Sequence, residues 1–251
     1  MDITFLGTGT STGVPEIGCR CAVCTSTDKR DWRLRTSVLV ETEGKTILLD
    51  CGPDFRWQMI RSKTDHLDAV LISHEHYDHV GGLDDLRPFC RQKGVAVYAE
   101  GYVAEAIETR IPYAFRVHKY PGVPNLELHR LLLQPFVAAG IPVIPIRVMH
   151  GKLPIFGYRI GNMAYITDVK YLPEEEYGKL EGLDLLILTA LRMEPHPAHE
   201  SLDEALANIE RIRPKEAYLI HMSHGIGLHA QVEKMLPPHV HLSYDGLHVA
   251  I

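Results

Sequence analysis

The stretch His74-Glu75-His76-Tyr77-Asp78-His79 decides the fold of this chain. It places three imidazoles and two carboxylates within two turns of backbone, directly after the apolar run Ala69–Ile72. Even if Glu75 points away, four strong metal ligands this close together are too many for one tetrahedral ion held by a short loop. They suit two neighbouring ions, each completed by ligands from elsewhere in the chain. The stretch therefore predicts part of a dinuclear metal site.

Composition indicates a soluble globular protein, since 45% of the 251 residues are apolar and 23% are charged. No apolar run reaches the roughly 18–20 residues that a membrane span needs. The segment Met1–Gly7 lacks the basic start of a signal peptide, so we expect a cytoplasmic protein with no membrane partner. A formal net charge of -6 argues against extended nucleic-acid binding. It still permits a small anionic substrate, because bound divalent cations would invert the local field.

Short apolar runs bounded by Gly, Pro or Asp predict strands, and helical patterns lie between them. Strands are expected at Ile3–Leu6, Ser37–Val40, Thr46–Leu49, Ala69–Ile72, Val95–Tyr98, Val143–Met149, Phe156–Ile160, Met163–Thr167, Leu185–Leu188, Tyr218–Ile220 and near Leu247–Ile251. Helices are expected at about Pro53–Arg61, Leu83–Gln92 and Tyr102–Thr109, after the capping box Ser201–Glu204, and near His229–Met235. The Pro-rich segment Pro121–Pro145 reads as partly irregular. No linker divides the chain, so we expect one α/β domain over residues 1–251, with two sheets inside and helices outside.

Three more ligand-type residues follow largely apolar strands in the second half of the chain. His150 comes after one such strand, Asp168 after the next, and His221 after a third. Metal-ligating residues often lie in loops at strand ends, because the sheet fixes the positions of these loops. Imidazole and carboxylate together suit Zn, Mn, Fe or related ions. These residues are therefore candidates to complete the dinuclear site.

The order of these residues resembles that of the metallo-β-lactamase-fold hydrolases, in which a His-x-His-x-Asp-His loop precedes a lone His, a bridging Asp and a final His. The resemblance implies an αββα sandwich and two divalent ions, Mn²⁺ or Zn²⁺. It assigns His74, His76 and His150 to one ion, assigns Asp78, His79 and His221 to the other, and makes Asp168 the bridge. Asp50 matches a family acidic residue that supports the metal loop.

The run Cys19-Arg20-Cys21-Ala22-Val23-Cys24 is the second informative feature. It offers three thiolates from one short loop, and zinc requires a fourth ligand. In a cytoplasmic protein this pattern favours metal binding over a disulfide, with a redox site or unrelated buried thiols as the alternatives. Together with Gly7-Thr8-Gly9, the run resembles the phosphoribosyl cyclic phosphodiesterase type of phosphonate degradation. That resemblance implies a structural zinc held by Cys19, Cys21, Cys24 and His224.

The same resemblance implies a catalytic histidine just before a helix, and His199 matches it. The implied reaction is attack on a small phosphodiester, such as a cyclic ribose phosphate, by a hydroxide shared between the two metals. The His199 imidazolium would then protonate the leaving alkoxide, with Asp168 as the second catalytic residue. The stretch Thr189–Arg192 departs from the family pattern. The reaction class is therefore better supported than the substrate, and the family also favours a homodimer.

Three other functions fit parts of the pattern. A tRNA 3′-processing endonuclease shares the metal loop but carries a basic arm, and no Gly-rich, Lys/Arg-rich insertion is present here. A lactone or thioester hydrolase uses the same metal chemistry but usually lacks the Cys cluster. A non-catalytic, metal-stabilised binding subunit, like the pyrroloquinoline-quinone biosynthesis protein, has a similar Cys-rich start. Degenerate members of that kind normally lose ligands, whereas all the expected ligands are present here.

Overall fold

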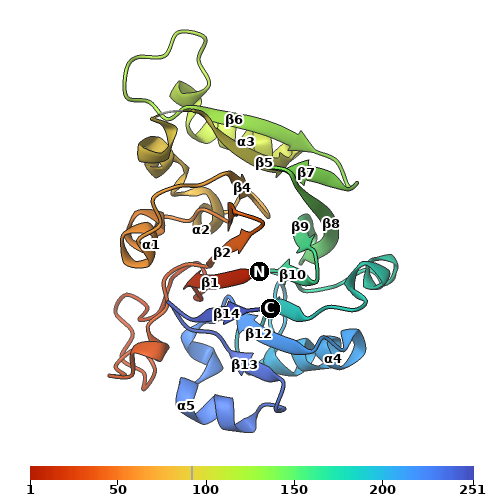
Figure 1. Ribbon diagram of the computed structural model, residues 1–251. Coiled ribbons are helices and arrows are strands. Elements are labelled where there is room, and N and C mark those ends of the chain that lie inside the picture. Colours follow the sequence, from red (N-terminus) through yellow and green to blue (C-terminus); the bar gives the residue numbers. More distant parts are fainter. Residues whose placement is uncertain (92) are drawn as a thin grey trace.

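The computed structural model describes residues 1–91 and 93–251, and its core is a pair of seven-stranded sheets (Figure 1). The strand order of the first sheet is β14-β1-β2-β3-β4-β5-β6, and that of the second is β13-β12-β11-β10-β9-β8-β7. Helix α3 packs on the outside of the first sheet and α4 on the outside of the second. This arrangement confirms the expected αββα sandwich.

The strands of the first sheet are β1 (Asp2–Gly7), β2 (Ser37–Thr42), β3 (Lys45–Leu49), β4 (Ala69–Leu71), β5 (Val95–Glu100), β6 (Leu126–Leu131) and β14 (His248–Ala250). Those of the second are β7 (Phe136–Ala138), β8 (Ile141–His150), β9 (Leu153–Ile160), β10 (Met163–Ile166), β11 (Leu185–Thr189), β12 (Glu216–Ile220) and β13 (Val240–Leu242). The α-helices are α1 (Phe55–Ser62), α2 (Tyr77–Val80), α3 (Gly101–Arg110), α4 (Leu202–Ile212) and α5 (His229–Val232). The 3₁₀ segments are η1 (Lys29–Asp31), η2 (Leu83–Cys90), η3 (Pro112–Ala114), η4 (Glu174–Leu180), η5 (His224–Ile226) and η6 (Glu233–Met235).

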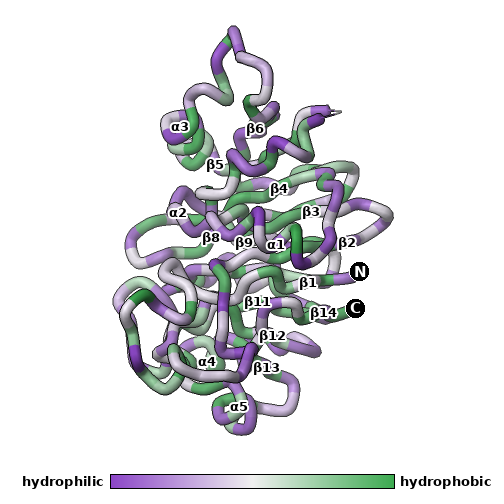
Figure 2. Tube along the Cα trace, turned by 90° about the vertical axis from the view of Figure 1, so that its left-hand side faces the viewer, coloured by the Kyte–Doolittle hydropathy of each residue, from purple (hydrophilic) through white to green (hydrophobic). Residues whose placement is uncertain are grey.

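The apolar runs of the sequence are buried on both faces of each sheet. In β3, Ile47 and Leu49 pack between the two sheets, whereas Leu48 packs under the outer helices. In β11, Leu185 points between the sheets and Leu186 toward α4. Because successive side chains of a strand point to opposite faces, only a continuous apolar run can fill both layers. Figure 2 shows hydrophobic residues along the strands and hydrophilic ones on the outer loops.

One of two sequence expectations is confirmed and the other needs correction. The segment Pro121–Pro145 is partly irregular, as expected, although it also contains β6, β7 and the start of β8, where Pro142 and Pro145 are part of the strand. The expected helix Leu83–Gln92 is the 3₁₀ segment Leu83–Cys90, which contains Pro88, and Gln92 lies outside the described residues. Proline lacks the N–H that a regular α-helix ladder requires, which favours the shorter form.

The parallel strands place their carboxyl ends at one edge of the sandwich. Strands β3, β4, β5 and β6 run parallel in the first sheet, and β10, β11, β12 and β13 run parallel in the second. Strand β8 is antiparallel to β9, and β9 is antiparallel to β10, so β8 also ends at this edge. In open α/β sheets, ligand sites form beyond the carboxyl ends of the strands. The candidate ligands follow β4, β8, β10 and β12, and they meet at this edge.

Candidate metal centre

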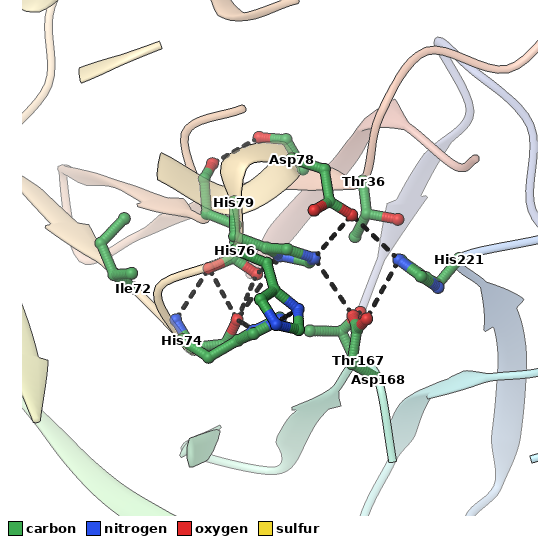
Figure 3. Close-up of polar contacts among 12 residues, drawn as sticks. Thr36, Ile72, His74, His76, Asp78, His79, Thr167, Asp168 and His221 are labelled. Atoms are coloured by element: carbon green, nitrogen blue, oxygen red, sulfur yellow. Dashed lines mark hydrogen bonds and ion pairs between the residues drawn. The ribbon is translucent and has the colours of Figure 1, made fainter. Parts of the chain in front are cut away.

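The short helix α2 presents two of the candidate ligands, and strand ends present the others. The chain leaves β4 through Ser73 and His74, and it turns at His76 into α2, which carries Asp78 and His79. Figure 3 shows the contacts that link His79 and His221 to both carboxylates of the site. The local sequence motif and the sheet topology therefore converge on one place.

Three non-glycine residues at strand ends adopt left-handed backbone conformations. Asp50 has φ of 60°, Asp168 of 57° and His221 of 59°. Asp50 and His221 directly follow buried strands, and Asp168 comes two residues after β10, so each left-handed residue turns the chain at the edge of a sheet. Such conformations cost energy for most residues, and they cluster at functional sites. The sequence pattern marked these positions as strand ends but did not predict this backbone geometry.

The first candidate ligand set consists of His74, His76 and His150, whose ligand atoms all lie within 4.8 Å of one another. His74 Nε2 and His76 Nδ1 are 2.9 Å apart. His150 Nδ1 donates to the carbonyl oxygen of Ala198 at 2.8 Å, so Nε2 is the nitrogen that can serve as a metal ligand in the neutral tautomer. This hydrogen bond to the backbone orients a ligating imidazole in the way that metal sites usually require.

The second candidate set consists of Asp78, His79, Asp168 and His221, again with ligand atoms within 4.8 Å of one another. His79 Nε2 lies 3.2 Å from a carboxylate oxygen of both Asp78 and Asp168. His221 Nε2 lies 3.4 Å from Asp78 and 3.2 Å from Asp168. All four residues are buried. Their polar atoms surround one point between the two sheets.

Asp168 lies where the two sets meet, and His199 stands beside it. Asp168 belongs to the second set and also forms a group with His150 and His199, in which the ligand atoms are within 4.8 Å of one another. His199 Nδ1 is 3.6 Å from Asp168 Oδ1, and the His199 side chain retains 12% exposure. Burial lowers the pKa of His199 to about 3. The placement supports either a proton-transfer role or a ligand role for His199, and the second possibility was not apparent from the sequence.

The charges at this edge fit divalent cations. The carboxylates of Asp50, Asp78 and Asp168 are buried, and within residues 1–91 and 93–251 their ion-pair partners are histidines, with no Lys or Arg. Burial opposes ionisation, but His79 and a hydrogen bond from His221 lower the pKa of Asp78. Burial likewise opposes protonation of His79, yet the surrounding carboxylates raise its pKa well above the usual value. Buried charges need partners, and bound cations would balance these three carboxylates.

Asp50 orients the His79 ring through the ring nitrogen that does not face Asp78 and Asp168. Its carboxylate accepts hydrogen bonds from His79 Nδ1 at 2.8 Å, Tyr165 Oη at 2.7 Å and the Ser73 N–H at 2.8 Å. His79 Nε2, which faces the other carboxylates, is buried and has no hydrogen-bond partner among the described residues. An imidazole fixed through one nitrogen, with the other nitrogen buried and unsatisfied, is prepared for a metal. The donor set therefore fits the implied ions.

The cysteine run forms a separate cluster. The Sγ atoms of Cys19, Cys21 and Cys24 and a ring nitrogen of His224 lie within 4.8 Å of one another, and Cys24 Sγ is 3.3 Å from His224 Nδ1. These cysteines are free thiols. A hydrogen bond from the Cys24 N–H lowers the pKa of Cys21, whereas burial raises that of Cys24 to about 11. Three sulfurs and one imidazole match a tetrahedral structural zinc site.

Comparison with known proteins identifies the family. The sequence profile described as "Beta-lactamase superfamily domain" matches residues 45–222. The crystal structure of a diphosphatase of the PhnP family is 40% identical, with a TM-score of 0.93 over 99% of this chain and 96% of that one. Zinc-bound PqqB from Methylobacterium extorquens is 19% identical with a TM-score of 0.81 over the full length of both chains, which supports the fold alone.

The chain belongs to the β-lactamase superfamily and has the metallo-β-lactamase fold. Its sequence and structure resemble the PhnP type of this superfamily. An octanoyltransferase of Porphyromonas gingivalis is 49% identical over the whole of this chain, and a ribonuclease Z of Thermosynechococcus vestitus is 28% identical over 64% of it. This chain spans 52% of the first relative and 36% of the second. Within the described residues, no helix is long and apolar enough to cross a membrane.

Proposed function

We propose that this chain hydrolyses a small phosphodiester at the metal centre. The observation that carries the proposal is the juxtaposition of two ligand sets around Asp168, with His199 at their exposed side. Two-metal centres of this kind act on phosphorus–oxygen bonds, where two cations flank the phosphoryl group. The likeness to a PhnP-family diphosphatase at 40% identity supports the same chemistry.

The proposed metal ligands divide into two groups. His74, His76 and His150 would hold one divalent ion, and Asp78, His79 and His221 the other, with Asp168 shared. When bound, Mn²⁺ or Zn²⁺ ions would activate water and neutralise negative charge on the phosphoryl group. Asp50 keeps His79 oriented, while the Thr189 hydroxyl accepts a hydrogen bond from the Asp168 N–H at 2.6 Å. Cys19, Cys21, Cys24 and His224 would hold a third ion, a structural Zn²⁺.

His199 is the proposed proton donor. The oxygen of a water molecule forms the new bond to phosphorus and that water releases a proton to solvent, while the bond to the leaving alkoxide breaks. The His199 imidazolium supplies the proton that the alkoxide takes up, and His199 regains a proton from solvent afterwards. Its position beside Asp168, partly open to solvent, carries this assignment. A bound phosphoryl anion next to the ring would favour the imidazolium form and oppose the effect of burial.

A diphosphate is the second candidate substrate, since the similar crystal structure is that of a diphosphatase. A phosphodiester and a substituted diphosphate both present a phosphoryl group between two oxygens, so the same residues could act on either. Thioester hydrolysis stays a further alternative, because the long relative from Porphyromonas gingivalis is named an octanoyltransferase. A cytoplasmic location and a homodimer stay predictions from the sequence.

The decisive experiment compares substrate classes at measured metal content. The protein is loaded with Mn²⁺ or Zn²⁺, and its metals are counted by elemental analysis. It is then assayed on bis(p-nitrophenyl) phosphate, cyclic ribose phosphates, a nucleoside diphosphate sugar, a tRNA precursor and an octanoyl thioester. Turnover of phosphodiesters that disappears in Asp168→Ala supports the proposal. A folded, metal-loaded protein that is inactive on every phosphorus substrate would contradict it and favour a binding subunit.

A further inference from the structure

A cavity of about 630 Å³ lies beside helix α1. The segment Thr12–Pro15, residues Lys29 and Trp32–Arg35, and the α1 residues Trp57 and Arg61 line it. Figure 1 shows the segment before β2, coloured red to orange, on the same side of the molecule as α1. None of the candidate metal ligands is among the lining residues. The cavity is therefore distinct from the metal centre and needs its own explanation.

The lining of this cavity is strongly cationic. Lys29, Arg33, Arg35 and Arg61 line it with one acidic residue, Asp245, which lies 4.0 Å from Arg61. Arg35 pairs with Asp54 at 3.2 Å, and the four cations still outnumber these two carboxylates. This excess occurs in a chain whose formal net charge is -6, so it is a local concentration and does not reflect general basicity. A concave surface lined by one sign of charge concentrates ligands of the opposite sign. The cavity thus favours an anion.

Two of these guanidinium groups keep hydrogen-bonding capacity. Arg33 is 3% exposed, and its Nη1 donates to Thr8 Oγ1 and to the carbonyl oxygen of Ser243, whereas its Nη2 is buried without a partner among the described residues. Arg35 pairs with Asp54 through Nη1 at 3.2 Å, but its Nε is buried without a partner in that same part of the chain. Buried donors without acceptors cost stability, and an anion bound in the cavity would supply the missing acceptors.

The cavity also holds both tryptophans of the chain. Trp32 is 45% exposed and Trp57 is 54% exposed, although large aromatic side chains are usually buried. The Trp32 ring is fixed, because its Nε1 donates to the Ser26 carbonyl oxygen at 3.0 Å and the Lys29 ammonium lies 3.9 Å from the ring centroid. Exposed aromatic rings beside cations are the combination that binds a nucleobase by stacking and its phosphate by charge.

We propose that this cavity binds a mononucleotide, with the base against the tryptophan rings and the phosphate against the arginines. Its volume lies within the range of about 300–1,000 Å³ that is typical of small-molecule sites. Gly52 lies between the lining residue Arg35 and the candidate ligand Asp78, which brings the cavity close to the metal centre. A Cβ added at Gly52 would lie 3.5 Å from the Arg35 Cβ and 2.1 Å from the Asp78 carbonyl oxygen. The nucleotide could thus be the distal half of a substrate, which would rest on the proposed function, or a separate ligand.

Tryptophan fluorescence reports on this cavity directly, since both tryptophans line it. The full chain is titrated with adenosine 5′-monophosphate, and separately with adenosine and with inorganic phosphate. We expect a saturable change with the nucleotide and weaker binding of either fragment. Trp57→Leu should weaken nucleotide binding on the order of 5- to 150-fold, read from the remaining Trp32. Arg61→Gln should weaken it on the order of 10-fold. The matched control, Arg116→Gln at an exposed site outside the cavity, should bind normally.

Other variants separate this site from the metal centre. Asp168→Ala should keep its nucleotide affinity, so the cavity proposal can hold even if the proposed hydrolysis fails. Competitive inhibition of phosphodiester turnover by the nucleotide would identify the distal half of a substrate, and absence of competition would identify a separate ligand. Both results support the site. The proposal is overturned if the nucleotide gives no saturable signal, if Asp168→Ala abolishes that signal, or if Arg61→Gln and Trp57→Leu bind like the parent protein.

Discussion

Replacing Asp50 by Asn tests whether the support behind His79 matters to metal binding. Asp50 is completely buried, and its carboxylate accepts hydrogen bonds from His79 Nδ1, Tyr165 Oη and both the N–H and hydroxyl of Ser73. The residue has φ of 60°, a conformation that Asn tolerates well, so the substitution adds little backbone strain. Asp50→Asn therefore perturbs the hydrogen bonds and the charge while the side-chain shape stays similar.

The expected loss can be worked out from these contacts. Asn must place an NH₂ donor where one carboxylate oxygen now accepts. If the NH₂ replaces Oδ1 it meets the Ser73 N–H, and if it replaces Oδ2 it meets the donors of His79 and Tyr165. Hydrogen bonds to a charged group contribute about 1.5–3 kcal/mol each. Loss of such a supporting contact typically costs 10–100-fold in metal affinity. We expect that loss at the set containing His79.

Metal affinity is measured by competition with a chelator of known affinity, and metal content by elemental analysis. Tyr165→Phe is the matched control, because it removes one neutral hydroxyl donor to the same carboxylate and should cost about 2- to 10-fold. The set of His74, His76 and His150 should lose less affinity than the set containing His79. If folded Asp50→Asn binds both ions as tightly as the parent protein, the support argument is wrong.

Four further results are expected. His199→Ala should lower turnover by about 10²–10⁴-fold with metal content unchanged; loss of a metal would instead make His199 a ligand. Cys21→Ser should lose one zinc equivalent and lower the unfolding temperature, both measurable on one sample. Gly52→Ala should reduce activity, because the new Cβ would lie 2.1 Å from the Asp78 carbonyl oxygen and must displace α2. Burial raises the pKa of Asp245 to about 6 from 3.8, so the native state binds more protons than the unfolded state between these values. The unfolding free energy of the parent protein should therefore fall relative to that of Asp245→Asn as pH rises from about 4 to 6. Above pH 6 the difference between the two proteins should stay constant. Thermal unfolding of both proteins, measured across this pH range, checks the prediction.

The sequence predicted the parts of the site that depend on local pattern. The metal loop is a contiguous run, and the short apolar run Ala69–Ile72 before it favoured a buried strand, which the structure has at Ala69–Leu71. His150 is the last residue of β8, and Asp168 and His221 come just after β10 and β12, so all three lie at strand ends as expected from the apolar runs before them. The strands alone marked these residues as ligand candidates, and the family resemblance supplied the expectation that they come together.

Contacts between segments far apart in the sequence could not be predicted from the local pattern of apolar and polar residues. Tyr165 donates to Asp50 from 115 positions away, and nothing near either residue predicts the pair. The left-handed conformations of Asp50, Asp168 and His221 depend on how the chain must turn once the sheets have packed. The cationic cavity was missed for the same reason, because Lys29 to Arg35 and the α1 residues join only in the folded protein.

The segment from His221 to His224 joins the two candidate ligand clusters, and its backbone contacts predict that mutation can separate them. His221 lies in the main centre and His224 in the cysteine cluster, only three positions apart. Between them, the Met222 N–H donates to the Thr8 carbonyl oxygen at 2.9 Å, and the Ser223 N–H donates to the Leu191 carbonyl oxygen at 2.9 Å. These backbone contacts hold His221 independently of the sulfur ligands. A metal lost from the cysteine cluster should therefore loosen the chain beyond Ser223 and leave the geometry around His221 in place.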